Sequence, residues 1–557
     1  MPTPKHVNYA NIAARLRRHA ERTPDKPAVV KCAGPGEHGV FSTTSRTFAQ
    51  LESDSDAAAR GLAKAGIERG TKTLVMLRPG HDFFTCFFAL FKIGAVPVFI
   101  DPGMGGKRLL ECVRELAPEA MVGIPLAHLI RIVRPRSFPN FKTAITVGRR
   151  WLWGGASWRN IREPSPETLP LAPTRSDELA AILFTTGSTG PAKGVEYTHG
   201  ALDRQIDLLA DTFAITADDK DCATFPGFSL FSIALGMTAV IPDMDPVRPG
   251  SVHPDNVITP IREMNCTFSF GSPALWARVS ASASERGVSL PGLKRVVMAG
   301  APVPAAVHER LLGGILPEDG ETYTPYGATE GMPVACIGGR EVIRETAALT
   351  AQGKGVCIGR PVQGTRVAII AITDEPIQTW SEDLVVPDGH IGEIAVQAPQ
   401  VSRHYHNLPK ADALAKISDG ESFWHRMGDV GYYDNQGRLW FCGRKAHRVR
   451  TQGGDLFSVR CEAVFVAHPL VNRSALVGVA AANGFERPVI IVETSEPLAA
   501  EQQKSMTDEL LTLGAANPET AGILDILFHT GFPTDIRHNA KIRREDLAVW
   551  AEKSLRA

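Results

Sequence analysis

The sequence predicts an α/β protein with a large N-terminal part of stacked α/β layers, a β-rich subdomain and a small α+β unit at the C-terminus. Its 557 residues, 44% of them hydrophobic, are too many for one core, so at least two domains are expected. Helical periodicity alternates with short apolar runs, which is typical of parallel sheets with helical crossovers. After Gly364 the predicted elements are mostly strands, and after Gly443 the sequence predicts helices and strands again.

The individual elements are predicted from the spacing of apolar residues and from the turn-forming residues that separate the apolar runs. Helices are predicted over Phe48–Ala65, Phe83–Ile93, Pro304–Leu312 and Glu545–Leu555, with a further one starting near Pro273. Strands are predicted over Thr73–Leu77, Val96–Ile100, Ala180–Phe184, Thr267–Phe270, Arg295–Met298, Arg366–Ile372 and Gly392–Val396. Lys92 and Pro97 interrupt the apolar stretch from Phe83 to Ile100, so a buried helix, turn and strand are favoured there over a transmembrane segment.

Charge and cysteine content narrow the class of protein. Sixty Lys and Arg balance sixty Asp and Glu, so the net charge gives no reason to expect nucleic acid or an acidic membrane as a partner. Nine cysteines without a CxxC pair indicate reduced thiols. The N-terminus has no apolar core of a signal peptide. We therefore expect a cytoplasmic protein without a transmembrane segment.

The stretch FTTGSTGPAKGV, from Phe184 to Val195, follows a predicted strand and concentrates glycines, hydroxyls and one cation. Backbone N–H groups, hydroxyls and a lysine are what a polyphosphate needs, although loops of this composition are also common as surface turns. Lys193 follows Gly190 by three residues and precedes a glycine, which excludes a Walker P-loop. The predicted phosphate-binding residues are Thr185, Thr186, Gly187, Ser188, Thr189, Gly190 and Lys193.

This string resembles the phosphate loop of the AMP-forming adenylating enzymes, the superfamily of acyl-CoA synthetases, peptide-synthetase adenylation domains and firefly luciferase. Three more segments resemble that family in the family's order: PYGATEG at 325–331, RMGDVGYYDNQGRLWFCGRK at 426–445 and FPTDIRHNAKIRREDL at 532–547. With FKIGAVPVFIDP at 91–102, the resemblance spans nearly the whole chain.

The resemblance implies roles for particular residues, with ATP and Mg²⁺ as cofactors. Tyr326 would stack on adenine beside Gly327 and Ala328, Thr329 would contact the α-phosphate, and Glu330 would hold magnesium. The segment Gly300, Ala301 and Pro302 would line the adenine pocket, and Asp429 and Arg444 would bind the ribose. Lys541 would bridge the substrate carboxylate and the α-phosphate, which makes Lys541, Glu330 and Thr329 the predicted catalytic set. The alternatives are that Glu330 is an ordinary charge at a helix N-terminus and that Lys541 starts an exposed basic helix.

The family's fold implies a division into residues 1–443, which bind ATP and the acyl substrate, and a mobile unit 444–557 that carries Lys541. Ala446 occupies the hinge position. In the family, FSFGSPALW at 268–276 would form part of the acyl pocket wall. The predicted pocket residues are Phe228, Ser229, Phe270 and Trp276, for which core packing is an equally good explanation.

Four departures from the family pattern suggest the reaction. Ser229 replaces a usual histidine, Ala446 replaces Asp or Lys, Ala540 replaces a glycine, and TQGGD at 451–455, around Gly454, lacks the usual lysines. Three of them affect the thioester half-reaction or the rotation that permits it, whereas the adenylation residues are intact. Within the superfamily this combination most resembles the olefin β-lactone synthetases.

That resemblance implies ATP-dependent activation of a long-chain 2-alkyl-3-hydroxy acid as acyl-adenylate, followed by attack of its own 3-hydroxyl to give a β-lactone, AMP and diphosphate. Other enzymes of olefin biosynthesis are then expected as partners. A long-chain fatty acyl-CoA ligase is the alternative, and a degenerate adenylate-binding module is a third reading. His447 is a candidate base for the hydroxyl or else a surface histidine. The segment Trp151–Pro173 is either a variable surface excursion or a lid or docking segment.

Overall fold

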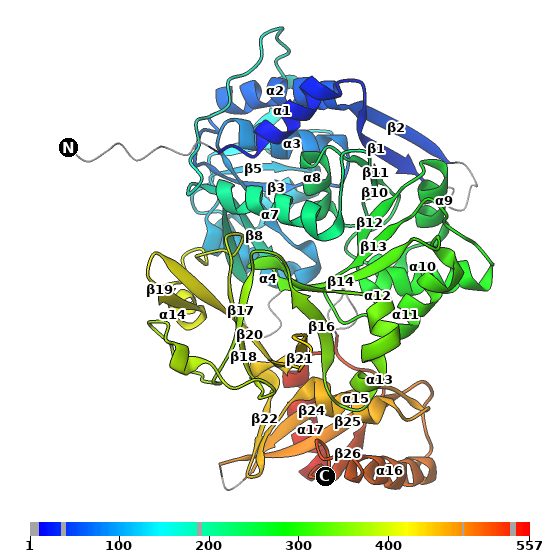
Figure 1. Ribbon diagram of the computed structural model, residues 1–557. Helices are drawn as coiled ribbons and strands as arrows, with labels where there is room; N and C mark the ends of the chain where they lie inside the picture. Colours follow the sequence, from blue (N-terminus) through cyan, green and yellow to red (C-terminus); the bar gives the residue numbers. More distant parts are fainter. Residues whose placement is uncertain (1–9, 35–40, 186–191, 482–483, 535–541, 557) are drawn as a thin grey trace.

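The computed structural model describes residues 10–34, 41–185, 192–481, 484–534 and 542–556 (Figure 1). Figure 1 shows the C-terminal elements, coloured orange to red, gathered below the rest of the chain. The predicted α/β architecture, with its β-rich subdomain and small α+β C-terminal unit, is confirmed. Outside the described residues lie the predicted Thr186, Gly187, Ser188, Thr189 and Gly190, together with Ala540 and Lys541.

One sheet of the N-terminal part has the strand order β7-β6-β5-β3-β4-β8-β9 and is parallel up to β9, which pairs antiparallel with β8. Its strands are β3 (Lys72–Met76), β4 (Val96–Ile100), β5 (Ala120–Gly123), β6 (Thr143–Thr146), β7 (Ala156–Ser157), β8 (Leu179–Thr185) and β9 (Lys193–Thr198). The helices between them are α2 (Phe48–Lys64), α3 (His81–Lys92), η2 (Pro102–Met104), α4 (Gly106–Leu116), α5 (Pro125–Val133), η3 (Pro135–Ser137) and α6 (Trp158–Ile161).

A second, longer sheet begins with the order β2-β1-β11-β10-β12-β13-β14, parallel except for the β1/β2 pair. These strands are β1 (Pro27–Ala33), β2 (Ser42–Thr47), β10 (Lys220–Cys222), β11 (Thr238–Ile241), β12 (Phe268–Gly271), β13 (Arg295–Met298) and β14 (Glu321–Ala328). The accompanying helices are α1 (Ala13–Arg22), α7 (His199–Phe213), α8 (Pro226–Ala234), η4 (Pro249–Ser251), α9 (Asp255–Glu263), α10 (Pro273–Glu285), α11 (Ala305–Arg310) and η5 (Leu311–Ile315).

The same sheet continues antiparallel through the β-rich subdomain, in the order β15-β16-β21-β20-β18-β17. Its strands are β15 (Gly331–Gly338), β16 (Val356–Pro361), β17 (Arg366–Ile370), β18 (Gly392–Gln397), β19 (Lys416–Asp419), β20 (Ser422–Tyr433) and β21 (Leu439–Arg444). Between them lie α12 (Gly339–Glu341), η6 (Val342–Thr346), α13 (Ala347–Ala351), η7 (Glu382–Leu384) and α14 (Pro409–Ala415). The antiparallel part thus starts at β15, earlier than Gly364, where the sequence predicted the strand-rich part to begin. It starts there because a tight turn at Thr329 and Glu330 reverses the chain.

The C-terminal unit has its own sheet, β24-β25-β26, and a hairpin, β22-β23. Its elements are η8 (Lys445–His447), β22 (Val449–Thr451), β23 (Gly454–Leu456), α15 (Ser458–Val466), β24 (Val471–Ala480), β25 (Glu486–Thr494), α16 (Ala500–Ala515), β26 (Asp525–Phe528) and α17 (Arg544–Arg556). The division at residues 443 and 444 and the mobility of this unit stay predictions.

Several predicted boundaries agree with the structure because they rest on local chemistry. Strands β4 and β13 match their predicted ranges to the residue. Helix α10 starts at Pro273, where the Ser272 hydroxyl accepts a hydrogen bond from the backbone of Leu275. The predicted helix over Pro304–Leu312 loses its α-helical form after Arg310, ahead of the non-helical Gly313 and Gly314.

The apolar stretch from Phe83 to Ile100 forms the buried helix α3 and the strand β4, as predicted. Lys92, which interrupts it, is fully buried, and its Nζ lies 2.6 Å from Asp56 Oδ1 and 2.8 Å from Glu52 Oε2 on α2. A buried lysine is tolerated because it is paired and hydrogen-bonded. No helix in the described part of the chain is long and apolar enough to cross a membrane.

The segment Trp151–Pro173 is only partly a surface excursion. Trp158 is buried, and its indole N–H donates to Asp82 at 2.8 Å. Leu169 and Leu171 pack against the hydrophobic core that contains α2 and α3. Trp151, in contrast, is exposed.

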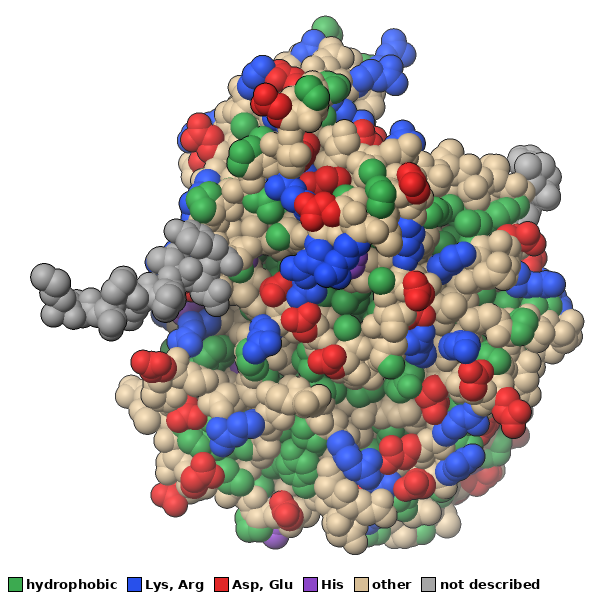
Figure 2. Space-filling model, turned by 45° about the horizontal axis from the view of Figure 1, so that its top comes forward, with side chains coloured by type: hydrophobic (Ala, Val, Ile, Leu, Met, Phe, Trp, Pro, Cys, Tyr) green, Lys and Arg blue, Asp and Glu red, His purple; other side chains and the backbone are tan. Residues whose placement is uncertain are grey.

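On the face drawn in Figure 2, Lys and Arg side chains are interspersed with Asp and Glu side chains, as the balanced composition predicts.

Buried histidines predict acid sensitivity of the fold. Burial lowers the pKa of His308 on α11, and that of His199, from 6.5 to about 4. Between these pH values the unfolded chain binds more protons than the folded chain, so the free energy of unfolding falls as the pH falls, by about 3 kcal/mol for each group over the whole window. We expect His308→Gln to make the decrease shallower in urea denaturation from pH 6.5 to 4. Equal slopes for variant and wild type would contradict this.

Candidate active site

A cavity of about 1480 Å³ lies among the two large sheets and the C-terminal unit. Its polar end is lined by the predicted Lys193, Gly300, Ala301, Pro302, Tyr326, Gly327, Ala328, Thr329, Glu330, Asp429, Arg444 and Ala446. Thr534, His447 and residues 542–546 contribute from the C-terminal unit. Residues far apart in the sequence are thus brought to one space, although their roles toward a nucleotide stay predictions.

The predicted ribose residues lie opposite each other on the hairpin β20/β21. Asp429 and Arg444 are cross-strand partners, and Asp429 Oδ1 lies 2.9 Å from the Arg444 guanidinium. The Tyr326 hydroxyl donates to Asp429 Oδ2 at 2.6 Å. Burial raises the pKa of Asp429, while Arg444 and the Tyr326 hydroxyl favour its charged form. This carboxylate is held in place by partners on both of its oxygens.

Glu330 sits in the turn between β14 and β15, so the alternative of a helix N-terminal charge is wrong. The Tyr405 hydroxyl donates to Glu330 Oε1 at 2.6 Å. Beside it, the Tyr197 hydroxyl donates to the carbonyl of Thr329. Lys193 Nζ lies 4.7 Å from the centre of the Tyr405 ring. Tyr405 therefore orients the Glu330 side chain and also flanks Lys193, the lysine of the predicted phosphate loop.

The glycine after Lys193 has a steric reason. Gly194 in β9 pairs with Phe184 in β8, and a Cβ at this position would come within 2.6 Å of Phe184 Cζ. A larger residue would push β9 away from β8 and displace Lys193. The Lys-Gly pair thus reflects close strand packing beside the loop.

Sequence reasoning missed Tyr405 and also Lys416, whose Nζ lies 5.5 Å from the Tyr405 ring centre. Lys416 donates to the carbonyl of Ser402, and burial lowers its pKa to about 7, opposed by the nearby charge of Glu330. Neither residue belongs to a motif that marks it. Only the tertiary contact with Glu330 reveals them.

The other end of the cavity is apolar. Phe228 on α8 and Phe270 on β12 are stacked, with ring centres 4.2 Å apart and planes 6° from parallel. Both line the cavity. Ser229 does not line it, because its hydroxyl turns back to the carbonyl of Phe225 at 3.0 Å. Trp276 does not line it either and packs fully buried in a separate core cluster. Further apolar walls come from α3, α7 and α8 with Phe83, Phe87, Phe88, Phe91, Leu202, Ile206, Leu230, Phe231 and Ala234.

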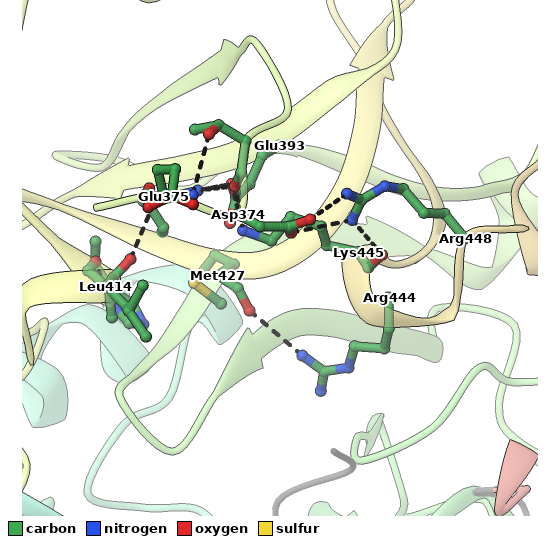
Figure 3. A network of polar contacts seen from close by, with 12 residues as sticks. Asp374, Glu375, Glu393, Leu414, Met427, Arg444, Lys445 and Arg448 are labelled. Atoms are coloured by element: carbon green, nitrogen blue, oxygen red, sulfur yellow. Dashed lines mark hydrogen bonds and ion pairs between the residues drawn. The ribbon is translucent and has the colours of Figure 1, made fainter. Parts of the chain in front are cut away.

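A network of ion pairs, buried at Glu393 and Arg426, anchors the segment from Lys445 to Arg448 around the predicted hinge residue (Figure 3). Glu393 on β18 accepts from Arg426 on β20 at 2.6 Å and from Lys445 Nζ at 3.0 Å. Arg448 is bound to Asp374 at 2.6 Å and donates to the Lys445 carbonyl at 2.9 Å. The exposed Ala446 lies between these anchors. The hinge position is thus tied to the β-rich subdomain on both sides.

The chain around Ala446 is closely packed, as Gly443 and His447 show. Gly443 has φ +136°, and a Cβ there would come within 2.6 Å of Ser458 Oγ. The His447 side chain is buried, so the surface reading of this histidine is wrong. Its Nε2 lies 3.4 Å from Glu545 Oε1, and burial, reinforced by Arg544, lowers its pKa to about 4.

The sequence matches the family described as AMP-binding enzyme over residues 16–406, more than half of the chain. The chain belongs to the AMP-binding enzymes. Within this family it is 46% identical to an olefin beta-lactone synthetase of Xanthomonas campestris pv. campestris over 552 residues, covering 98% of both chains. It is also 46% identical to an olefin beta-lactone synthetase of Stenotrophomonas maltophilia, again over 98% of both chains.

Solved structures agree with this AMP-binding enzyme fold. The anthranilate CoA ligase crystallised with anthranoyl-AMP is 18% identical, has a TM-score of 0.78, and matches over 99% of this chain and 98% of its own. An O-succinylbenzoate coenzyme A synthetase of Bacillus subtilis, in complex with ATP and a magnesium ion, is 18% identical with a TM-score of 0.74, over 96% of this chain and 98% of its own. At this identity the likeness concerns the fold alone.

The hinge network predicts a large loss of stability when its acid is removed. Glu393→Gln would leave the buried Arg426 without a counter-charge, so we expect the free energy of unfolding to fall by about 3–5 kcal/mol. Glu119→Gln, which breaks an exposed pair with Lys142, is the control and should change it by less than about 1 kcal/mol. Urea denaturation measures both. Equal effects would contradict the prediction.

Proposed function

We propose that this AMP-forming ligase converts a long-chain 2-alkyl-3-hydroxy acid and ATP to a β-lactone, AMP and diphosphate. The observation that carries the proposal is the 46% identity over 98% of the chain to two olefin beta-lactone synthetases. It is supported by the cavity, whose polar end is lined by Lys193, Glu330, Asp429 and other predicted adenylation residues among those described, and whose other end is lined by phenylalanines. The acyl-CoA ligases among its relatives are more distant, at 25% and 27% identity.

The residues at the polar end fit ATP with magnesium. The fixed Asp429 carboxylate offers acceptors for ribose hydroxyls, and Tyr326 stands beside it on the cavity wall. Glu330 is a single carboxylate, held by Tyr405 through one oxygen. Magnesium prefers oxygen ligands and is usually held by one or two carboxylates together with substrate phosphates. When bound, it would neutralise phosphate charge, and Glu330 would be its protein ligand.

In the first step, an oxygen of the substrate carboxylate would attack the α-phosphorus, the bond to the β-phosphate would break, and diphosphate would leave. Thr329, Lys193 and Lys541 would bind the phosphate and carboxylate oxygens. One ammonium about 4 Å from the reacting oxygens contributes roughly 4 kcal/mol at an effective dielectric near 20, about a thousandfold in rate. These roles extend the family resemblance to the matching residues of this chain.

In the second step, the 3-hydroxyl oxygen would attack the activated carbonyl carbon, the bond to AMP would break, and the hydroxyl proton would leave. Because nucleophile and electrophile belong to one molecule, positioning replaces much of the entropy cost of a bimolecular step. His447 is our candidate to receive the proton, because it lines the cavity and its Nε2 lies 3.4 Å from Glu545 Oε1, a carboxylate that would stabilise the protonated ring.

This second step needs neither a thiol nor room for a pantetheine arm. The anchoring of Lys445 and Arg448 on both sides of Ala446 supports an enzyme that completes its reaction in one arrangement of the two units. The cavity volume of about 1480 Å³ exceeds the usual range of about 300–1,000 Å³, which favours a nucleotide together with a large acyl group. Each buried methylene would contribute about 0.8 kcal/mol to binding.

Product identity tests the proposal. We expect the protein, given ATP, magnesium and a racemic long-chain 2-alkyl-3-hydroxy acid, to form a β-lactone and AMP, with no effect of added coenzyme A. NMR of the extracted products distinguishes lactone from thioester. A thioester formed only with coenzyme A would establish the acyl-CoA ligase instead, and no nucleotide consumption with any carboxylic acid would establish a binding module.

Lys541 provides a separate test of the first step. We expect Lys541→Ala to abolish formation of the acyl-adenylate, because the ammonium between carboxylate and phosphate is lost, while the affinity for ATP stays nearly unchanged. Exchange of labelled diphosphate into ATP measures the first quantity and calorimetric titration the second. Lys504→Ala, on the distant helix α16, is the matched control. Unchanged exchange in Lys541→Ala would remove this residue from its role.

Association with other enzymes of olefin biosynthesis and a cytoplasmic location are part of the same proposal. A strained lactone is reactive, which favours direct transfer to the enzyme that consumes it. The nine cysteines are all free thiols, eight of them buried, which favours a reducing compartment.

A further inference from the structure

Exposed apolar side chains gather where α5 meets the loop that follows β6. Six of the thirteen large apolar side chains exposed among the described residues lie here, with exposed fractions from 46% to 103%. These six, which we call the α5 surface, are Leu126, Leu129, Ile132, Val133, Trp151 and Leu152. An apolar patch of this kind on a folded protein marks an interaction site more often than chance exposure does.

The α5 surface is preformed. Trp153 stacks on Trp151 with ring centres 6.1 Å apart and on the buried His128 of α5 at 6.0 Å. Its carbonyl accepts from Arg131 at 3.1 Å, and its indole N–H donates to Thr146 at 3.0 Å. The loop is therefore fixed against the helix, and Leu152 is held fully in solvent.

Positive charge surrounds the α5 surface, although the whole chain is neutral. From residue 120 to residue 162 the sequence holds eight Lys or Arg and no Asp or Glu. Arg134, Arg136 and Arg149 are exposed, and their side chains make no hydrogen bond or ion pair with any described residue. An anionic surface would find these three cations available.

Two of the eight cations are paired with acids from outside this stretch: Lys142 binds Glu119 at 3.2 Å, and Arg162 binds Asp82. Arg134, Arg136 and Arg149 have no such partner among the described residues. The chain as a whole is neutral, but the region around the α5 surface carries uncompensated positive charge.

The place of the α5 surface in the sheet relates it to the cavity. Strands β4, β5 and β6 are parallel, so the segments after them lie at one edge of the sheet. Residues 103–108, which follow β4, line the cavity, whereas α5 follows β5 and the Trp151 loop follows β6. Only β3 separates β4 from β5, a distance of about 10 Å between strand axes.

We propose that the α5 surface docks this protein onto an anionic lipid bilayer. Leu152 and Leu126 enter the boundary between headgroups and acyl chains, Trp151 lies at headgroup level, and Arg134 and Arg149 bind lipid phosphates. Bulky apolar side chains ringed by arginine and tryptophan are the chemistry of interfacial docking. The surface consists of a helix and a turn whose Leu152 is fully exposed, which suits insertion into a bilayer better than it suits a groove-filling protein partner.

Sedimentation with lipid vesicles tests the proposal on the full chain. We expect binding to vesicles of equal parts phosphatidylglycerol and phosphatidylcholine, and much weaker binding to phosphatidylcholine alone. Raising the salt from about 0.1 M to 1 M should weaken binding, since the Debye length falls from about 10 Å to 3 Å. Equal binding to both vesicle types, or binding to neither, overturns the proposal.

Two double variants separate the apolar and the charged contribution. Leu126→Asp with Leu152→Asp should reduce binding to background, and Arg134→Glu with Arg149→Glu should weaken it at least about thirtyfold. The controls are Leu524→Asp, which changes a leucine 75% exposed elsewhere, and Lys504→Glu on α16, and both should bind as wild type. Melting curves confirm that each variant is folded.

Two further outcomes overturn the proposal. One is vesicle binding by both double variants equal to wild type. The other is a dimer in sedimentation velocity that Leu126→Asp with Leu152→Asp dissolves, because the surface would then be an interface between copies of this chain. ATP-dependent turnover of the substrate in detergent solution is expected to be unchanged in all variants, so failure of docking is distinguished from failure of the proposed reaction.

Discussion

One buried carboxylate, that of Glu393, joins the β-rich subdomain to the segment that follows β21. It neutralises Arg426 within the β-rich subdomain and Lys445 at the first residue beyond β21. Burying three charges is unfavourable unless each finds its partner, so the strands and the hinge segment must take their positions together. The same strand β20 carries Asp429 three residues after Arg426, so the packing that satisfies Glu393 also positions the part of the cavity wall that contains Asp429.

The anchoring of the segment around Ala446 is compatible with the proposed reaction, which needs no thiol acceptor after adenylation. An enzyme that must admit a thiol after adenylation has to rearrange the walls of its site, and each rearrangement breaks contacts that stabilise the first state. Here Arg448 and Lys445 hold the segment around an alanine. The alanine has no polar side chain that could make different contacts in two arrangements of the chain. In the proposed intramolecular reaction, an anchored segment at this wall of the cavity would help to keep water away from the acyl-adenylate.

Local patterns predicted the fold well, since strands such as β4 and β13 are short apolar runs bounded by glycine, proline or charge. Site residues embedded in motifs also reached the cavity, among them Tyr326 and Asp429. Side-chain direction was not predictable: Trp276, in the first turn of α10, does not line the cavity and packs into another core cluster. Long-range contacts were equally hidden, because nothing near Tyr405 in the sequence indicates that it holds Glu330.

The cavity wall and the hydrophobic core share side chains. Phe83, Phe87, Phe88 and Phe91 line the cavity and also belong to the main core cluster with α2. A smaller residue at one of these phenylalanines would therefore enlarge the cavity and also remove packing from the centre of the N-terminal part. Under the proposed function, evolution toward longer or shorter acyl chains is then constrained by folding, and a lineage that changes its substrate range must first accumulate stability elsewhere.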